Sequence, residues 1–429
     1  MSDVSRKSTP WLDIGLLARN RDFRNVFIAR TISLLGLGML SVAIPLQVFE
    51  LSGDSARVGL ALALEGGGMF AGLLLGGMLA DRYDRKCLIL LARMAAGLGF
   101  VALAINAFWA HGRPEQEVLW AIYLLALWDG FFGAIGVTAL LAAMPHIVGR
   151  ENLLQARALS MLSMRLAMVV SPAVGGLLIA LWGVSWNYLI AALATGLTLL
   201  PLLGLPRMRP ELPDKSHPLR SLAEGLRFLL GNKVLAGVVL VGVLLTFATA
   251  IRALFPALVQ TTYAGGAFEL GLMYSAVPLG ASVAALLSGW ASQLARPGMA
   301  MQFIGLGAFV CLLALGLSAH FFLALVLLTL FGGLVAVAAL LQYALVQGHT
   351  PDAYLGRVNG LWTAQDALGD SVGTLGAGWL AQALSPLGSL LVLGGASLIL
   401  GVGALAGLPA LRNAPLEAVS PVAVSRATS

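Results

Sequence analysis

The amino-acid sequence predicts an all-α integral membrane protein with twelve transmembrane helices. Of its 429 residues, 59% are hydrophobic and only 11% are charged, and apolar stretches alternate with short polar loops. A soluble domain carries about 25% charged residues, whereas a helix of about 20 apolar residues crosses the ~30 Å hydrocarbon core of a bilayer. Lipid offers the backbone no hydrogen bonds, so apolar runs of this length are expected to be helices. The alternating polarity of membrane barrel strands is absent from the sequence.

Twelve apolar stretches, taken in order along the chain, are long enough to cross a bilayer. The longest internal polar stretch, 205–233, separates the sixth from the seventh. The predicted architecture is therefore two six-helix bundles, 25–204 and 234–411. The expected spans are 25–49, 56–80, 87–109, 118–144, 158–182, 185–204, 234–259, 268–294, 298–318, 320–347, 358–382 and 387–411.

The orientation follows from the placement of lysine and arginine, which favour cytoplasmic loops. The opposite loops carry only Arg57 and Arg113. Both termini are therefore expected in the cytoplasm, which requires an even number of spans, and twelve fits. The net charge of +6 indicates no nucleic-acid binding, because no basic strip with interleaved aromatics occurs. The basic residues of the alternate loops are Arg82, Arg85, Lys86, Arg150, Arg157, Arg207, Arg209, Lys215, Arg220, Arg227, Lys233, Arg296 and Arg357.

Three segments are expected outside the bilayer on the cytoplasmic side. The arm 1–24 is basic and has no early apolar core, so no cleavable signal peptide is expected. The linker 205–233 begins rich in proline and charge and continues, over 219–230, as an amphipathic helix expected on the membrane surface. The tail 412–429 is expected to be disordered.

Two carboxylates near mid-bilayer are the first candidates for a proton-binding role. A charge there costs at least ~2.5–3.5 kcal/mol and therefore needs a partner, water or a function. Asp129 lies about eleven residues into its span, beside Gly130, and Glu65 lies about ten residues into its span, before three glycines. A structural salt bridge from Asp129 to Arg165 or Arg93, and a water-facing position for Glu65, remain open alternatives.

Asp366 and Asp370 form a second acidic candidate in the eleventh span. Their i, i+4 spacing places them on one helix face, and repulsion between like charges favours the binding of a proton. Asp366 lies only about eight residues into its span, so a solvated cytoplasmic position is an equal alternative.

Four arginines inside the spans are candidates for binding an anionic substrate or for neutralising those acids. Arg165 and Arg252 are the stronger pair. Arg30 and Arg93 lie near cytoplasmic helix ends, from which a long side chain can reach the interface.

The loop between the second and third spans carries the most specific motif of the chain. It reads Gly77-Met-Leu-Ala-Asp81-Arg82-Tyr-Asp-Arg85-Lys86, and it resembles the loop signature of the major facilitator superfamily. The resemblance implies a latch that holds the two halves together in one conformational state, with Gly77 permitting close helix packing. A plain cytoplasmic basic loop is the alternative reading. The corresponding stretch 289–296 lacks the acid and two of the bases, so the latch is expected to be asymmetric.

A proline and glycine motif lies in the fifth span. Pro172, Gly175 and Gly176 are similar to a motif of the exporters within that superfamily. Proline frees a backbone carbonyl and glycine permits bending, so the motif favours a bending helix. Ordinary close packing of helices is the alternative.

The whole chain is similar to one branch of the superfamily, the exporters of the catechol siderophore enterobactin. The stretches 23–93, 127–143, 148–156 and 355–365 carry the resemblance. It implies export of enterobactin or a related catecholate to the periplasm by proton antiport, with alternating access between the halves. The aromatic residues that are candidates for stacking on catechol rings are Trp128, Phe131, Phe132 and Trp362.

This reading predicts a monomer in the lipid bilayer that uses the proton gradient and no cofactor, and that delivers its substrate towards an outer-membrane efflux channel. A broad multidrug/proton antiporter is the runner-up, and a channel or membrane receptor is a third class. No enzyme and no metal site are expected, because Cys87 and Cys311 lie far apart, the histidines are scattered and no nucleotide-binding loop occurs.

Overall fold

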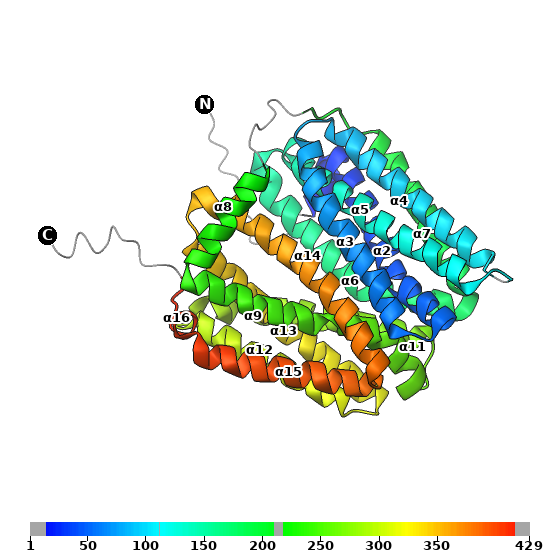
Figure 1. Ribbon diagram of the computed structural model, residues 1–429. Helices are drawn as coiled ribbons and strands as arrows, with labels where there is room; N and C mark the ends of the chain where they lie inside the picture. Colours follow the sequence, from blue (N-terminus) through cyan, green and yellow to red (C-terminus); the bar gives the residue numbers. More distant parts are fainter. Residues whose placement is uncertain (1–13, 111, 210–217, 417–429) are drawn as a thin grey trace, which may run out of the picture.

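The computed structural model describes residues 14–110, 112–209 and 218–416, and within these ranges it leaves out the side chains of 218–224, 292, 352 and 353. The described chain is almost entirely helical (Figure 1), which confirms the predicted all-α fold. The outer part of the expected arm, 1–13, the linker residues 210–217 and the tail residues 417–429 lie outside the described residues.

The first group of helices corresponds to the first six expected spans. Its members are joined by tight turns: Gly53, with a φ of 62°, ends one helix, and the side chain of Asp54 accepts a hydrogen bond from Ala56 N at the start of the next. The helices are α1 (Gly15–Arg19), α2 (Arg21–Ser52), α3 (Ser55–Ala80), α4 (Arg85–Phe108), α5 (Glu115–Val148), η1 (Arg150–Asn152), α6 (Leu153–Trp182) and α7 (Val184–Leu203).

The second group contains the remaining spans, and its first span is irregular. This span begins as α9, tightens into a 3₁₀ segment, η2, and ends in a π-helical turn, η3. Such departures from α-helix are frequent at functional hinges. The helices are α8 (Pro218–Gly231), α9 (Lys233–Thr249), η2 (Ala250–Leu254), α10 (Phe255–Ala257), η3 (Leu258–Thr262), α11 (Ala267–Leu287), η4 (Ser288–Gln293), α12 (Pro297–Gly316), α13 (Phe321–His349), α14 (Asp352–Ala383), α15 (Pro386–Gly407) and α16 (Pro409–Arg412).

Eleven helical segments of the described chain are long and apolar enough to cross a membrane. The one remaining expected span, 358–382, is α14, which has 32 residues but carries Asp366 and Asp370 and is less apolar than the others. α14 packs against α3 of the first group and α9 of its own group. Its polar residues are therefore placed among other helices, where a low hydropathy does not conflict with a membrane position.

The amphipathic helix expected over 219–230 is present as α8. Two of its described apolar side chains pack on protein. Phe228 stacks on Tyr354 of α14 with ring centroids 4.7 Å apart and an interplanar angle of 12°, and Leu229 is buried, whereas Leu226 and Leu230 are exposed. α8 thus covers the beginning of α14 (Figure 1). Its position on the membrane surface stays a prediction.

Glycines allow α3 to contact two helices at once. A Cβ atom at Gly68 would lie 3.0 Å from Phe131 N, and one at Gly72 would lie 2.9 Å from the Ala134 Cβ, so α3 and α5 meet backbone to backbone. On another face, a Cβ atom at Gly59 would lie 3.1 Å from the carbonyl carbon of Thr374 in α14. α3 therefore joins the two groups of helices.

α11 of the second group also joins the two groups, as α3 does from the first group. A Cβ atom at Gly332 of α13 would lie 2.8 Å from the Cα of Val277 in α11, and one at Gly176 of α6 would lie 2.9 Å from the Cα of Gly271 in α11. The pairs α3·α14 and α6·α11 are the two main contacts between the groups.

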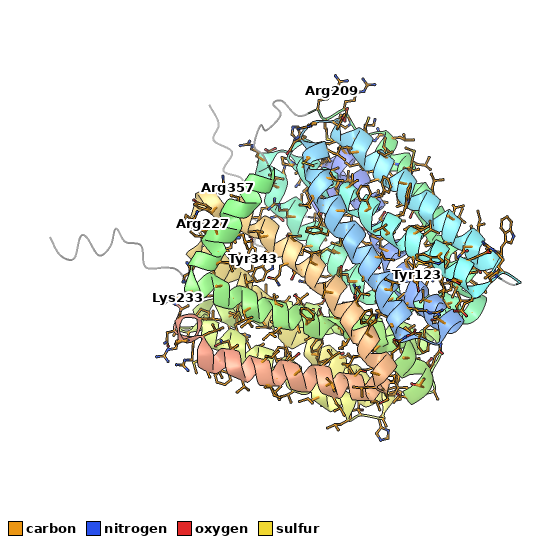
Figure 2. The ribbon with its side chains drawn as sticks, viewed as in Figure 1. Tyr123, Arg209, Arg227, Lys233, Tyr343 and Arg357 are labelled. Carbon is orange, nitrogen blue, oxygen red and sulfur yellow. The ribbon has the colours of Figure 1, made fainter. Side chains whose placement is uncertain are left out.

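The two ends of the molecule differ in charge and in contacts. Arg209, Arg227, Lys233 and Arg357 lie at one end, here called the basic end (Figure 2). The opposite end, here called the far end, contains the connection between α2 and α3, where Asp54 Oδ2 accepts a hydrogen bond of 2.7 Å from Gln382 Nε2 at the end of α14. The two groups are thus joined at the far end.

Candidate functional site

A cavity of about 530 Å³ lies between the two groups of helices. The first group contributes α2, α3 and α6, and the second contributes α9, η2, α10, α11, α13 and α14. Most of the wall is apolar, and a few polar side chains face it, an arrangement typical of small-molecule sites. The polar, aromatic and methionine side chains of the wall include Glu65, Met69, Met168, Thr249, Arg252, Phe255, Tyr274, Phe331 and Asp370.

An ion pair between Arg252 and Asp370 forms one wall of this cavity. Arg252 comes from the 3₁₀ segment η2 and Asp370 from α14. Their side chains remain 31% and 26% exposed, so both groups keep access to the cavity. The Tyr274 hydroxyl of α11 donates a hydrogen bond of 2.9 Å to the Arg252 carbonyl oxygen, which fixes the backbone that carries the guanidinium.

Glu65 faces this ion pair from the other group of helices. It lines the same cavity and interacts electrostatically with Arg252 and Asp370. The next residue, Gly66, brings α3 close to α14, because a Cβ atom there would lie 3.4 Å from the Ser371 Cβ. Arg252 therefore shares the cavity, and interacts electrostatically, with a carboxylate of its own group and a carboxylate of the other.

Asp129 lies behind Glu65, away from the cavity. It is only 5% exposed, and its Oδ1 has no hydrogen-bond partner among the described residues. Its electrostatic partners are Glu65 and Arg93. Of the two arginines considered as its counter-ion, the structure thus sets Arg93 and not Arg165 against it. Arg93 is half-buried, and its position relative to the membrane interface stays a prediction.

These residues form a series of charged side chains, here called the charge chain, that runs through both groups and in which the like charges of Asp129 and Glu65 are neighbours. Its members in order are Arg93, Asp129, Glu65, Arg252 and Asp370. Buried or half-buried charges are stable only when opposite charges or hydrogen bonds compensate them. Loss or gain of a proton on one acid therefore changes the balance of the others.

Asp366 has different surroundings from Asp370, although the two share a helix face. Its side chain is exposed, and its Oδ1 accepts a hydrogen bond of 3.2 Å from the Thr246 hydroxyl of α9. The solvated cytoplasmic position that the sequence left open for Asp366 stays a prediction. Asp366 lines a second, smaller cavity beside the central one.

Arg30 and Arg165 do not line the central cavity. Both are half-buried, and Arg30 interacts electrostatically with Arg93, which carries the same charge. Neither arginine is therefore placed to bind a substrate in the central cavity in this conformation.

All four predicted aromatic residues lie outside the central cavity. The Trp128 indole donates a hydrogen bond of 2.8 Å to the Ala95 carbonyl oxygen of α4, and its ring lies 4.4 Å from that of Phe132. Phe131 packs edge-on against Phe132. Trp362 lines the smaller cavity.

The aromatic residues that do line the central cavity were not predicted. They are Phe255, Tyr274 and Phe331. The sequence contains no signal that separates them from aromatics facing lipid, because all of these residues occur in apolar stretches.

The signature loop docks on its own group of helices. Asp84 caps α4 by accepting a hydrogen bond of 2.9 Å from Lys86 N, and its Oδ1 also accepts one of 3.2 Å from Met208 N. Lys86 Nζ donates a hydrogen bond of 2.7 Å to the Leu203 carbonyl oxygen at the end of α7.

Other residues of this loop have varied surroundings. Arg85 contacts the ring of His146 in α5 at 3.0 Å, whereas Asp81 and Arg82 are exposed. The close packing expected at Gly77 is not made, since a Cβ atom there would meet nothing within 4 Å. Its neighbour Gly76 makes the close approach instead, because helix geometry turns Gly76 and not Gly77 towards α5.

The proline and glycine motif of α6 lies at an interface between the groups. A Cβ atom at Gly175 would lie 2.8 Å from the Cα of Met39 in α2, and Gly176 contacts α11. The Ser275 hydroxyl of α11 accepts a hydrogen bond of 3.1 Å from Ala173 N, next to Pro172. α6 runs through the motif without a break, so its visible role here is close packing.

Within the described ranges, no group of three or more histidine, cysteine or acidic side chains could hold a metal ion. Cys87 and Cys311 are free thiols.

Comparison with known proteins supplies the relatives of this chain. A family described as transmembrane secretion effector matches residues 17–424. An enterobactin exporter of Shigella boydii is 50% identical over 402 residues, which cover 94% of this chain and 95% of that protein. An enterobactin exporter of Escherichia coli strain K12 is 49% identical with the same coverage.

Solved transporter structures share the fold at low sequence identity. A nucleoside transporter has a TM-score of 0.73 at 12% identity, covering 90% of this chain and 99% of its own. A bacterial homologue of the human lysosomal transporter Spinster, in an inward-facing and unoccupied conformation, has a TM-score of 0.68 at 13% identity, covering 94% and 97%.

Proposed function

Because the chain belongs to the transmembrane secretion effector family of the major facilitator superfamily, we propose that it exports enterobactin or a closely similar catecholate siderophore from the cytoplasm to the periplasm. The proposal rests on relatives that are 49–50% identical along nearly the full length and are enterobactin exporters. The role is transport driven by the proton gradient, and no catalytic step or cofactor is involved.

The orientation proposed is that of a bacterial inner-membrane protein with both termini in the cytoplasm. Lysine and arginine gather at the basic end, which the positive-inside rule assigns to the cytoplasm. The far end is then periplasmic, and the hydrogen bond between Asp54 and Gln382 closes the transporter on that side. Substrate reaches the cavity from the cytoplasm in this conformation.

The single observation that carries the mechanism is the position of the charge chain across the central cavity. Glu65 belongs to one group, and Arg252 and Asp370 belong to the other. When Glu65 is ionised, its attraction to Arg252 adds to the contacts between the groups. When Glu65 takes up a proton, that attraction is lost and the two groups separate more easily.

Proton antiport follows if substrate and proton compete for this arrangement. A catecholate substrate in the cavity supplies polar oxygens to Arg252, and it stacks on Phe255, Tyr274 or Phe331. Release of the substrate to the periplasm lets Glu65 bind a proton from that side, and the return to the cytoplasmic conformation delivers the proton inward. Asp129, behind Glu65, is the second acid of this pathway.

The two bundles, 25–204 and 234–411, are proposed to rock about the contacts α3·α14 and α6·α11. The signature loop is docked on its own group in the present conformation. Its exposed residues Asp81 and Arg82 then remain available to contact the second group when the basic end closes. The protein is proposed to act as a monomer and to deliver its substrate to an outer-membrane efflux channel.

A multidrug/proton antiporter is the second candidate, because most of the cavity wall is apolar and includes the flexible side chains of Met69 and Met168. Deletion of the gene separates the two functions. The siderophore exporter predicts that enterobactin accumulates inside the cell, with no change in sensitivity to cationic dyes. Increased dye sensitivity with normal enterobactin secretion would instead support the multidrug function.

A further inference from the structure

A second cavity, of about 270 Å³, opens beside the central one within the second group of helices. The two cavities share Thr249 and Asp370 in their walls. The smaller one, here called the side pocket, lies between α9, α13 and α14, and its other walls include Trp362, Asp366 and Gln342. It is therefore a branch of the substrate cavity and not an isolated void.

The side pocket contains a buried amide with no partner. Gln342 is only 3% exposed, and its Nε2 has no hydrogen-bond partner among the described residues. Leaving a buried donor or acceptor unpaired costs about 1–3 kcal/mol, so this amide indicates a ligand that completes its hydrogen bonds.

The space in the side pocket exists because residue 242 is a glycine. A Cβ atom at Gly242 would lie 3.2 Å from Gln342 Nε2 and 3.5 Å from Trp362 Cη2. A cavity of about 150 Å³ accommodates benzene. The side pocket is thus large enough for one substituted aromatic ring lying against the Trp362 indole.

We propose that the side pocket binds one catechol ring of the iron-free substrate. Trp362 stacks on the ring, the two oxygens of the Asp366 carboxylate accept hydrogen bonds from the two adjacent hydroxyls, and Gln342 donates to an oxygen on the ring or its amide. The Thr246 hydroxyl holds the Asp366 carboxylate in place. This inference rests on the proposed export of a catecholate.

A carboxylate at this position distinguishes the iron-free siderophore from its iron complex. In the iron-free form the catechol oxygens carry protons and donate hydrogen bonds. In the iron complex the same oxygens are deprotonated and bound to the metal, so the complex is anionic and has no donor for Asp366. Like charges then repel, and the side pocket excludes the loaded siderophore.

Binding to the full-length protein in lipid nanodiscs tests this inference. Equilibrium dialysis measures the affinity for iron-free enterobactin and for ferric enterobactin. When a hydrogen bond to a charged group is lost and replaced by repulsion, the binding affinity falls by about tenfold or more. Wild-type protein should therefore bind the iron-free form at least about tenfold more tightly than the ferric form. Asp366→Asn should weaken binding of the iron-free form and reduce the preference to less than about threefold.

Two further variants separate the side pocket from a general loss of structure. Gly242→Ala places a methyl group in the side pocket without removing a polar group, and it should lower affinity for iron-free enterobactin by about tenfold. The control Glu117→Gln is the same kind of change in an exposed pair with Arg113, and it should bind as wild type. Any competition between a cationic dye and enterobactin should be the same in wild-type protein and in Asp366→Asn.

The outcomes separate this inference from the proposed function. If wild-type protein binds and exports enterobactin, but Asp366→Asn and Gly242→Ala keep wild-type affinity and preference, the side-pocket assignment is wrong and the export function stands. Asp366-dependent binding of the dye in place of the catechol would overturn the assignment too. If wild-type protein neither binds nor exports enterobactin, the proposed function itself fails.

Discussion

Arg252 and Asp370 form an ion pair that joins the irregular first span of the second group to α14, directly opposite Glu65 of the first group. The pair faces the cavity and is only partly exposed. It has the features that the proposed proton-coupled transport requires of such a pair, because it lines the cavity proposed to bind the substrate and lies near a carboxylate proposed to bind the proton.

Arg252→Gln removes the cation shared by Asp370 and Glu65. Both carboxylates then lack their opposite charge, and uptake of iron-free enterobactin into inside-out vesicles should fall by at least about tenfold, equivalent to about 1.4 kcal/mol. Arg165→Gln is a matched control, because Arg165 lies inside a span but does not line the cavity. Equal loss in both variants would contradict a specific role for Arg252.

Glu65→Gln fixes this side chain in a neutral form. We expect the proton gradient to lose its effect on accumulation, while exchange of internal for external substrate continues. Counterflow of labelled enterobactin in proteoliposomes measures the exchange. The control is Glu115→Gln, in an exposed pair with Arg57. Accumulation that still follows the pH gradient would remove Glu65 from the coupling role.

Asp129→Asn tests the second acid separately. Its carboxylate is buried and has one oxygen without a hydrogen-bond partner in the described part of the chain, so the change to an amide should not unfold the protein. Proton-coupled efflux should be abolished while membrane insertion and the elution profile in detergent remain normal. Wild-type transport would show that Asp129 is a structural partner of Arg93.

Gly67 and Gly68 are neighbours in α3 with opposite surroundings. A Cβ atom at Gly68 would overlap α5, whereas one at Gly67 would meet nothing within 4 Å. Gly68→Ala should destabilise the protein by about 1–3 kcal/mol through overpacking, and Gly67→Ala should be neutral or stabilise it by up to about 1 kcal/mol. Thermal unfolding in detergent measures both, and equal effects would contradict the packing of α3 on α5.

The contact between Asp54 and Gln382 predicts which side is closed. Cysteines at these two positions, in a chain with Cys87 and Cys311 replaced by serine, should be joined efficiently by a short bifunctional thiol reagent and should then block transport. Cysteines at Glu117 and Gln382 provide the control pair. Unimpaired transport after complete cross-linking would show that the far end does not open during the cycle.

The spans and their order were predictable, because hydrophobic length is a property of each segment alone. The bounds of α3 and α6, for example, differ from the expected spans by a few residues at most. The two groups, the basic end and α8 also follow from local composition. The apparent exception, α14, has low hydropathy because it faces other helices and cavities, a condition that no single-segment hydropathy measures.

The pairing of charges was not predictable to the same extent. The sequence identified Asp129, Arg93, Arg165, Arg252 and Asp370 as intramembrane charges, but their partners depend on the rotation of helices about their axes and on contacts between segments far apart in the chain. Gly76 and Gly77 show the same limit within one loop, since one step along the helix decides which glycine meets α5. The positions of Phe255 and Phe331 in the cavity wall could not be predicted for the same reason, because they too depend on the rotation of helices about their axes.

Transport in proteoliposomes tests the central claim most directly. Purified protein is reconstituted with its basic end outward, a pH gradient with acid inside is imposed, and uptake of labelled iron-free enterobactin is measured together with the release of internal protons. We expect gradient-dependent uptake accompanied by proton release, both absent in Glu65→Gln. Uptake that is independent of the gradient, or proton release that does not depend on enterobactin, would contradict proton-coupled export of the siderophore.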